Sequence, residues 1–358
     1  MQRNGTQHRT GAEPLLQVKD LKTYFFPEEG VVRAVDGASF AIYPGQTLGV
    51  VGESGCGKSI TARSILNLIE PPGRIVSGEI LLRDDFGTTD LTRLQSDSQA
   101  MRAIRGPVIA YVFQEPMSSF SPVHTIGSQI MEAILYHEKV SKREARARGV
   151  ELLRRVGIPR AEGRMDEYAF QLSGGLRQRA MIATALACNP KLLIADEPTT
   201  ALDVTTQAQI LELLRELQAQ NGMAIMLITH NLGVVAETAD DVVVMYLGRV
   251  VEEGPVDDIF YQPRHPYTQA LLRSIAMLSD EPRTRLPTIS GSIPHPYNRP
   301  HGCLFHPRCP RFMAGTCNAF EPRLRPVSGQ QAVSCFLYHE PEAERAVEAS
   351  PGASRHGH

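Results

Sequence analysis

Residues 52–59 read GESGCGKS and lie between an apolar run, TLGVV (47–51), and a helix-like segment, ITARSILNLIE (60–70). The octet fits G-x-x-x-x-G-K-[ST], in which a glycine-rich loop joins a buried strand to a helix and wraps phosphates with backbone amides. The helix that follows directs the positive end of its dipole at the same phosphates. An ordinary glycine-rich turn is the alternative, but the flanking patterns favour a nucleotide-binding loop.

Each residue type in the octet has a chemical task. Lys58 is expected to meet the β and γ phosphate oxygens, and the Ser59 hydroxyl to ligate Mg²⁺. Cys56 is expected to be a small filler of the loop rather than a nucleophile. The residues predicted to bind the nucleotide here are Gly52, Glu53, Ser54, Gly55, Cys56, Gly57, Lys58 and Ser59.

Composition limits the class of protein. With 358 residues, 42% of them hydrophobic, the chain is long enough for about two domains. The 37 Lys and Arg are balanced by 39 Asp and Glu, which gives no broad positive field, so a nucleic acid is not the expected partner. No apolar run approaches the roughly 18 to 20 residues that cross a bilayer, and the first residues lack the apolar stretch of a signal peptide. The six cysteines are therefore expected in a reducing cytosol.

Short apolar runs predict the sheet. Runs without alternation are typical of strands buried on both faces of a parallel sheet, and they are TLGVV (47–51), VIAYVF (108–113), KLLIAD (191–196) and AIMLIT (224–229). Alternating segments predict antiparallel strands added at one side, and they are residues 15–26, 31–45 and 240–254. Within the last of these, Leu247 and Gly248 could form a hairpin turn.

A helical insertion is predicted between about residues 115 and 180, where charged helical patterns such as SKREARARGVELLRRVGI (141–158) leave no clear strand. After residue 262 one helix is expected, and then Pro, Arg and Cys dominate. The predicted fold class is α/β: a P-loop domain with a mixed sheet and an inserted helical subdomain, plus a small Cys- and Pro-rich C-terminal extension.

Two adjacent carboxylates end the run KLLIADEP (191–198). Asp196 is placed to hold Mg²⁺ through water, and Glu197 to orient or deprotonate the water that attacks the γ-phosphate. Neighbouring acids at a strand end often form only a solvated turn. Because a phosphate-binding loop is present in the same chain, a catalytic pair of carboxylates is expected rather than a solvated turn.

Further motifs complete a known set: VFQEP (112–116), QLSGGLRQR (171–179), TTALDVT (199–205) and LITHN (227–231). With these in order, residues 15–262 resemble an ATP-binding cassette (ABC) ATPase. The resemblance implies ATP as the nucleotide and a head-to-tail pair of ATPase domains. Ser173, Gly174 and Gly175 match the signature that meets the ATP held by the partner's loop. Leu176 lies where the family most often has glutamine, and we expect this difference to modify the activity rather than abolish it.

The same resemblance assigns four more residues. Gln114 matches the glutamine that touches Mg²⁺ and water and links the site to a transmembrane partner, and His230 matches the switch histidine at the γ-phosphate. Asp203 matches a loop that crosses the dimer interface. Phe25 is expected to stack on adenine, with Tyr24 and Phe26 as neighbouring candidates.

Residues 245–272 and 302–324 are similar to the end of the ATPase domain and the C-terminal extension of oligopeptide and dipeptide importers. The predicted divisions are a disordered N-terminus (1–14), the ATPase domain (15–262), the extension (263–340) and a disordered tail (341–358).

Four cysteines crowd the predicted extension. Four thiolates suit zinc or an iron–sulfur cluster, the resemblance favours [4Fe–4S], and unligated thiols are the remaining alternative. The residues of this expected metal site are Cys303, Cys309, Cys317 and Cys335.

The resemblance implies an ATP-hydrolysing, Mg²⁺-dependent subunit that drives a peptide-class permease from the cytoplasmic side of the inner membrane. Its expected partners are two transmembrane permease subunits, a second ATPase that forms a heterodimer with it, and an extracytoplasmic substrate-binding protein, without nucleic acid. The cargo stays open among dipeptides, oligopeptides, nickel chelates, glutathione and drug-like molecules. The alternative is a soluble ABC ATPase acting on ribosomes or DNA, which would normally show two tandem cassettes or a long coiled-coil insertion.

Overall fold

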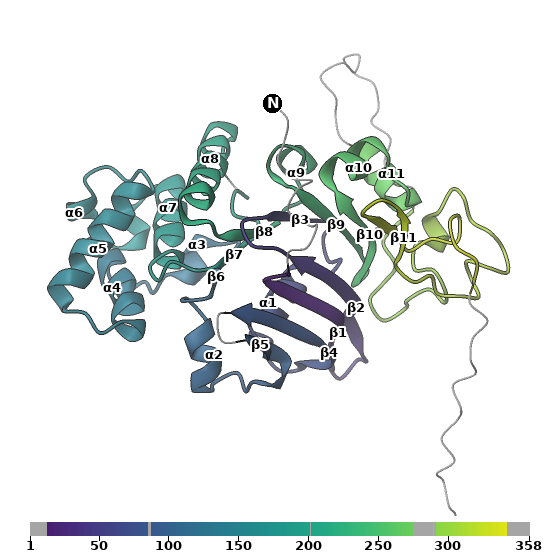
Figure 1. Ribbon diagram of the computed structural model, residues 1–358, viewed down its shortest axis with the longest axis horizontal. Helices are drawn as coiled ribbons and strands as arrows, with labels where there is room; N and C mark the ends of the chain where they lie inside the picture. The colour runs from purple at the N-terminus through teal and green to yellow at the C-terminus, as the bar shows by residue number, and fades with distance from the viewer. Residues whose placement is uncertain (1–12, 85–86, 201, 275–288, 290, 342–358) are drawn as a thin grey trace, which may run out of the picture.

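The computed structural model describes residues 13–84, 87–200, 202–274, 289 and 291–341 (Figure 1). The predicted disordered ends, 1–14 and 341–358, lie outside these residues except at positions 13, 14 and 341. Within the described ranges, no helix is both long and apolar enough to cross a bilayer.

An eight-stranded mixed sheet forms the centre of the molecule, in the order β11-β12-β10-β9-β3-β8-β7-β6. The four predicted apolar runs are β3, β8, β7 and β6, and they pair in parallel. Every residue of β3, β7 and β8 is buried, which explains why these strands lack alternation. The strand bounds are β3 Thr47–Val51, β6 Ile109–Val112, β7 Leu192–Asp196, β8 Ala224–Ile228, β9 Asp241–Tyr246, β10 Arg249–Pro255, β11 Arg325–Ser328 and β12 Gln331–Val333.

The hairpin between β9 and β10 turns at the predicted pair of residues. Leu247 and Gly248 have φ values of 45° and 82°, the left-handed conformation that a tight two-residue hairpin requires. A Cβ on Gly248 would also lie 2.7 Å from the carbonyl oxygen of Ala34. Glycine is needed there for both reasons.

A second, antiparallel sheet packs below the first, in the order β2-β1-β4-β5. The predicted antiparallel strands are present, but β1 and β2 form this separate sheet instead of extending the main one. Helix α1, Lys58–Ile65, lies between the two sheets (Figure 1), and its Ile65 shares a core with Leu48 of β3 and Leu21 of β1. The bounds are β1 Leu16–Phe25, β2 Val32–Ile42, β4 Gly73–Asp84 and β5 Gly87–Asp90.

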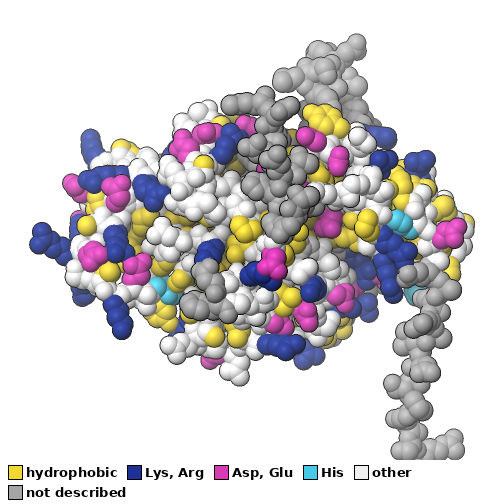
Figure 2. All heavy atoms as spheres, in the orientation of Figure 1, with side chains coloured by type: hydrophobic (Ala, Val, Ile, Leu, Met, Phe, Trp, Pro, Cys, Tyr) yellow, Lys and Arg dark blue, Asp and Glu magenta, His cyan; other side chains and the backbone are white. Residues whose placement is uncertain are grey.

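Helices α3 to α7 lie between β6 and β7 in the chain and gather at one end of the molecule (Figure 1). Figure 2 shows basic and acidic side chains interspersed over this end, and ion pairs such as Arg146 with Asp166 account for part of the pattern. The helix bounds are α2 Gln99–Ile104, α3 Pro116–Ser119, α4 Ile126–His137, α5 Lys142–Arg155, α6 Ala161–Arg164, α7 Gly174–Ala185, α8 Val204–Asn221, α9 Leu232–Thr238, α10 Val256–Tyr261 and α11 Pro266–Arg273, with 3₁₀ turns η2 Leu91–Arg93, η3 Ala169–Gln171 and η4 His306–Arg308.

The described C-terminal residues are tied to the main sheet. β12 pairs with β10, and β11 pairs with β12. Phe305 is 1% exposed and packs edge-on against Tyr246 of β9 and Tyr267 of α11, with ring centroids 5.4 Å apart in each pair. The C-terminal segment therefore shares an apolar core with the end of the main sheet.

A buried histidine begins α11 and makes stability depend on pH. His265 is 1% exposed, its Nδ1 accepts a hydrogen bond from the Tyr267 amide (3.0 Å), and burial lowers its pKa from 6.5 to about 3. The unfolded chain therefore takes up the proton first as pH falls. The stability contribution is complete above about pH 6.5 and decreases below it.

We predict that acidification from pH 7 to pH 5 lowers the free energy of unfolding through this residue by about 2 kcal/mol. His265→Asn keeps an acceptor at the helix N-cap without the titrating ring, so its urea-measured stability should vary less with pH. The exposed His301→Asn is the matched control and should keep the original pH dependence. Equal pH dependence in His265→Asn and the unmodified protein would contradict this account.

Candidate active site

The glycine-rich loop closes around a lysine. Lys58 is buried, and its Nζ donates to the carbonyl oxygens of Gly52 (2.8 Å) and Glu53 (3.1 Å). α1 begins directly after the loop, so its free amides point toward the space that phosphates would fill. Cys56 is 3% exposed, and burial raises its pKa, in keeping with its predicted role as a filler.

Two glycines let the loop lie against its neighbours. A Cβ on Gly52 would come within 2.2 Å of the Met245 carbonyl oxygen, and one on Gly57 within 2.3 Å of the Ala34 carbonyl oxygen. Both glycines also have positive φ, 149° and 100°. At Gly55, also at positive φ, no atom lies within 4 Å of an added Cβ. The spacing of glycines thus fixes where the loop contacts β9 and β2.

Oxygen ligands for a cation meet at the end of β7. Ser59 Oγ donates to Asp196 Oδ1 (2.9 Å), and the Tyr111 hydroxyl donates to Asp196 Oδ2 (2.7 Å). Burial raises the pKa of Asp196, and the neighbouring Glu197 carboxylate adds to the rise. A divalent cation would favour the charged carboxylate, and oxygen is the ligand that Mg²⁺ prefers. Ser59 and Asp196 therefore fit a magnesium ion.

Glu197 is the point on which other predicted residues converge. Its Oε2 accepts hydrogen bonds from Gln114 Nε2 (2.8 Å) and Thr200 Oγ1 (2.9 Å), and His230 Nδ1 lies 3.5 Å from Oε1. Glu197 has a φ of 48°, and its amide donates to the Ile228 carbonyl oxygen of β8 (2.9 Å). The residues around the carboxylate thus follow the ends of three strands, β6, β7 and β8, at the edge of the sheet where the loop begins.

Tyr111 and Thr200 belong to this site but were not predicted. Thr200 carries a weak sequence signal, because a threonine three residues after a carboxylate can bond back to it across a turn; the Thr200 amide donates to the Glu197 carbonyl (3.2 Å). Tyr111 carries no such signal. It reaches Asp196 only because β6 is the neighbour of β7.

The predicted signature lies at a helix start. Ser173 is the N-cap of α7, and Gly174 is exposed in its first turn. Figure 1 shows α7 among the helices at one end of the molecule, away from α1. Asp203 caps α8 by accepting from the Thr206 amide (3.0 Å), while Leu176 packs into the helical core.

Comparison with known proteins decides the family. Residues 35–200 match the ABC transporter family, and residues 251–317 match the oligopeptide/dipeptide transporter C-terminal region. Over 333 residues the chain is 52% identical to the oligopeptide transport ATP-binding protein AppD of Bacillus subtilis. The alignment covers 93% of this chain and 99% of that protein. The chain belongs to the ATP-binding subunits of the oligopeptide/dipeptide ABC transporters.

Other relatives of this ABC ATPase agree. It is 50% identical over 321 residues to the dipeptide transport ATP-binding protein DppD of Haemophilus influenzae, covering 90% of this chain and 94% of that one. Among solved structures it resembles the ATP-binding cassette MJ0796, in a dimeric post-hydrolysis state bound to ADP and Pi. That match has a TM-score of 0.59 and 27% identity, over 67% of this chain and 98% of the other.

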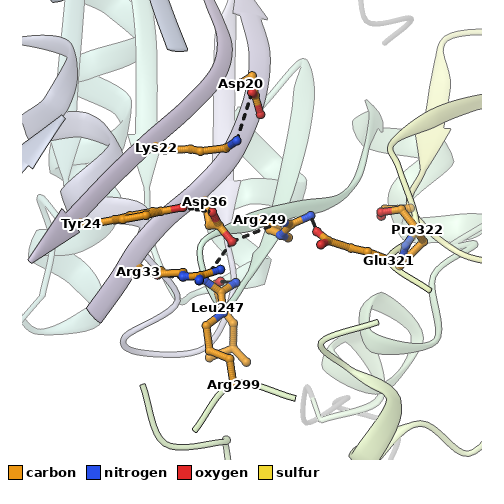
Figure 3. A network of polar contacts seen from close by, with 11 residues as sticks. Asp20, Lys22, Tyr24, Arg33, Asp36, Leu247, Arg249, Arg299, Glu321 and Pro322 are labelled. Atoms are coloured by element: carbon orange, nitrogen blue, oxygen red, sulfur yellow. Dashed lines mark hydrogen bonds and ion pairs between the residues drawn. The ribbon is translucent and has the colours of Figure 1, made fainter. Parts of the chain in front are cut away.

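The aromatic residues predicted near adenine have different surroundings in this ABC ATPase. The Tyr24 hydroxyl donates to the Asp36 carboxylate (Figure 3), and burial together with that carboxylate raises the Tyr24 pKa to about 12. The Phe26 ring lies under the Arg74 guanidinium, 4.5 Å from its centroid. Phe25, at the end of β1, remains the predicted stacking residue.

The iron–sulfur prediction, and with it the zinc alternative, is wrong. In the part of the chain that the structure describes, no group of three or more His, Cys, Asp or Glu side chains is arranged to hold a metal ion. Burial raises the pKa of the Cys303 thiol to about 12 and that of the Cys335 thiol to about 11. Cys303 and Cys309 pack against the apolar cluster around Phe305. All four residues of the predicted site are free thiols: Cys303, Cys309, Cys317 and Cys335.

We predict that Gly57→Ala weakens MgATP binding by about 10- to 100-fold, because the added Cβ forces the loop away from Ala34. Gly55→Ala meets no neighbouring atom and has only the left-handed strain, so it should weaken binding less. Titration calorimetry of the two purified variants measures the difference. Equal losses would show that contact with β2 does not shape the loop.

Proposed function

We propose that this chain is the ATP-hydrolysing subunit of an importer that powers uptake of peptides, or a related small solute, through a membrane permease. The observation that carries the proposal is the Glu197 carboxylate, held by Gln114 and Thr200 beside a complete phosphate-binding loop. The relatives that are named for oligopeptide and dipeptide transport support peptides as the cargo class. Nothing comparable supports a ribosome- or DNA-directed ATPase.

In the proposed mechanism the loop amides and Lys58 bind the triphosphate, and Phe25 stacks on the adenine. Ser59 and Asp196, with Gln114, would hold a magnesium ion, which would supply positive charge to the phosphates. Glu197 orients the attacking water and accepts its proton. The hydrogen bonds from Gln114 and Thr200 orient the carboxylate and limit its rotation.

His230 would complete the γ-phosphate end of the site. Its side chain is 60% exposed and lies beside Glu197, so it can turn toward a bound nucleotide. In this arrangement His230 contacts the phosphate, while Glu197 handles the water.

A second ATPase chain would complete each site. The exposed start of α7, with Ser173, Gly174 and Gly175, offers free amides to an anion that is not held by its own chain's loop. Asp203, fully exposed at the start of α8, would lie at the same interface. The dimeric state of the similar cassette MJ0796 supports this pairing, and we propose a different ATPase as the partner chain.

The remaining proposals concern location and organisation. The chain would bind two permease subunits at the cytoplasmic face of the inner membrane, in a system served by an extracytoplasmic substrate-binding protein. We propose an ATPase domain at 15–262, with its helical subdomain at about 115–180, and a Cys- and Pro-rich extension at 263–340. The match to the oligopeptide/dipeptide transporter C-terminal region supports the extension.

Glu197→Gln should keep MgATP affinity but slow hydrolysis by about 10² to 10⁴, because an amide cannot accept the proton of the attacking water. Phosphate release by the assembled transporter and nucleotide binding by the purified chain measure the two effects. Glu212→Gln, the same change on the exposed face of α8, should leave both unchanged. Near-normal turnover in Glu197→Gln would move the catalytic role to another residue.

Gly174→Asp should spare MgATP binding by the isolated chain and abolish turnover in the assembled transporter, because the new carboxylate would meet the partner's phosphates. Gly163→Asp in α6 is the control: an added Cβ there meets no atom within 4 Å. A loss of nucleotide affinity in the isolated Gly174→Asp chain would place the signature in its own site and refute the trans assignment.

A further inference from the structure

Glu53, the second residue of the phosphate-binding loop, is paired with the C-terminal segment. The Arg308 guanidinium donates from Nη1 to Glu53 Oε2 (2.7 Å) and from Nη2 to Oε1 (3.0 Å). The Arg308 side chain is 4% exposed and that of Glu53 is 21% exposed. Two parallel bonds from a planar guanidinium fix both the position and the orientation of the carboxylate. This contact joins residues that are 255 positions apart.

The backbone of Glu53 is held from the same side. Its amide donates to the Tyr267 hydroxyl (2.8 Å), and Tyr267 is fully buried. Tyr267 packs with Tyr246 and Phe305, and Phe305 lies three residues before Arg308. One aromatic cluster therefore supports both groups that contact the loop.

The C-terminal segment is anchored a second time behind the loop. Arg299 lies 3.2 Å from Asp36 Oδ2 and donates to the Leu247 carbonyl oxygen (2.8 Å), as Figure 3 shows. The next residue, Gly248, donates its amide to the Cys56 carbonyl oxygen (2.8 Å). The C-terminal segment thus contacts the loop itself through Arg308. Through Arg299 it contacts Leu247, the neighbour of the Gly248 that bonds to the loop.

The negative charge of Glu53 makes its pairing with Arg308 important for ATP binding. The loop must wrap a triphosphate with several negative charges, yet it carries the Glu53 carboxylate. An unpaired carboxylate there would repel the phosphates, and the low-dielectric surroundings would strengthen the repulsion. Arg308 balances that charge and holds the carboxylate with two hydrogen bonds.

We propose that Arg308 is a positioning residue for ATP: by pairing with Glu53 it neutralises the loop and holds it in the phosphate-binding conformation. The C-terminal segment is then part of the nucleotide site. This inference rests on the proposed binding of ATP at Lys58.

The test compares variants of the full-length chain for MgATP affinity, and of the assembled transporter for KM and kcat. Arg308→Met should weaken MgATP binding by about 10- to 100-fold and raise KM, with kcat within about twofold at saturating ATP. Arg311→Met, the same change at an exposed site three residues away, should have no effect. An affinity in Arg308→Met equal to that of Arg311→Met would overturn the proposal.

The double variant Glu53→Gln with Arg308→Met separates charge balance from simple packing. Removing the unpaired carboxylate should restore at least part of the lost affinity, so the double variant should bind MgATP more tightly than Arg308→Met alone. If the double variant binds MgATP no more tightly than Arg308→Met alone, Arg308 acts only through packing and the charge-balance proposal is overturned.

Two further variants keep the test decisive. If Arg308→Met does not fold, Arg308→Lys takes its place, because lysine keeps the positive charge but cannot make the second bond to Glu53. Arg308→Lys should lose less MgATP affinity when Glu53 is also changed to Gln than when Glu53 is kept. An equal loss of affinity with Glu53 and with Gln at position 53 would overturn the proposal. Lys58→Ala reports on the loop itself. Undiminished MgATP affinity in Lys58→Ala would overturn the ATP site as well as this inference, whereas failure at Arg308 alone leaves the ATP site standing.

Discussion

The parallel pairing of β3, β8 and β7 is the constraint on which the active site depends. Because these strands run in the same direction, their carboxyl ends open at one edge of the sheet. The phosphate-binding loop, Glu197 and His230 each follow one of these ends, and Gln114 follows β6 beside them. Residues far apart in the chain therefore meet around one carboxylate, as catalysis of phosphoryl transfer by positioning requires.

The phosphate-binding loop is shaped by its surroundings as much as by its own sequence. β2 and β9 contact it so closely that only glycine fits at two positions. The C-terminal segment adds Tyr267 and Arg308, which hold the backbone and the side chain of Glu53. The phosphate-binding loop of this chain is therefore contacted by segments from both ends of the chain.

The cysteines show why local density in a sequence does not establish a metal site. A metal ion needs ligand atoms at fixed distances and in the charged form, and neither condition is visible in spacing. Here the described residues contain no group of three or more His, Cys, Asp or Glu side chains arranged to hold a metal ion. The same segment instead reaches the phosphate-binding loop through Arg308, which bonds to Glu53 and to which the sequence drew no attention.

The sequence by itself determined the α/β P-loop fold with its mixed sheet, the four parallel strands, the hairpin at Leu247 and Gly248, and the phosphate-binding loop. Each depends on short-range patterns of apolar residues and glycine. It did not determine that β1 and β2 form a sheet of their own, since strand alternation does not specify a partner. Only the tertiary structure placed Tyr111 on Asp196 and Arg308 on Glu53. Those contacts depend on strand order and on the path of the returning chain, and neither leaves a mark in the local sequence.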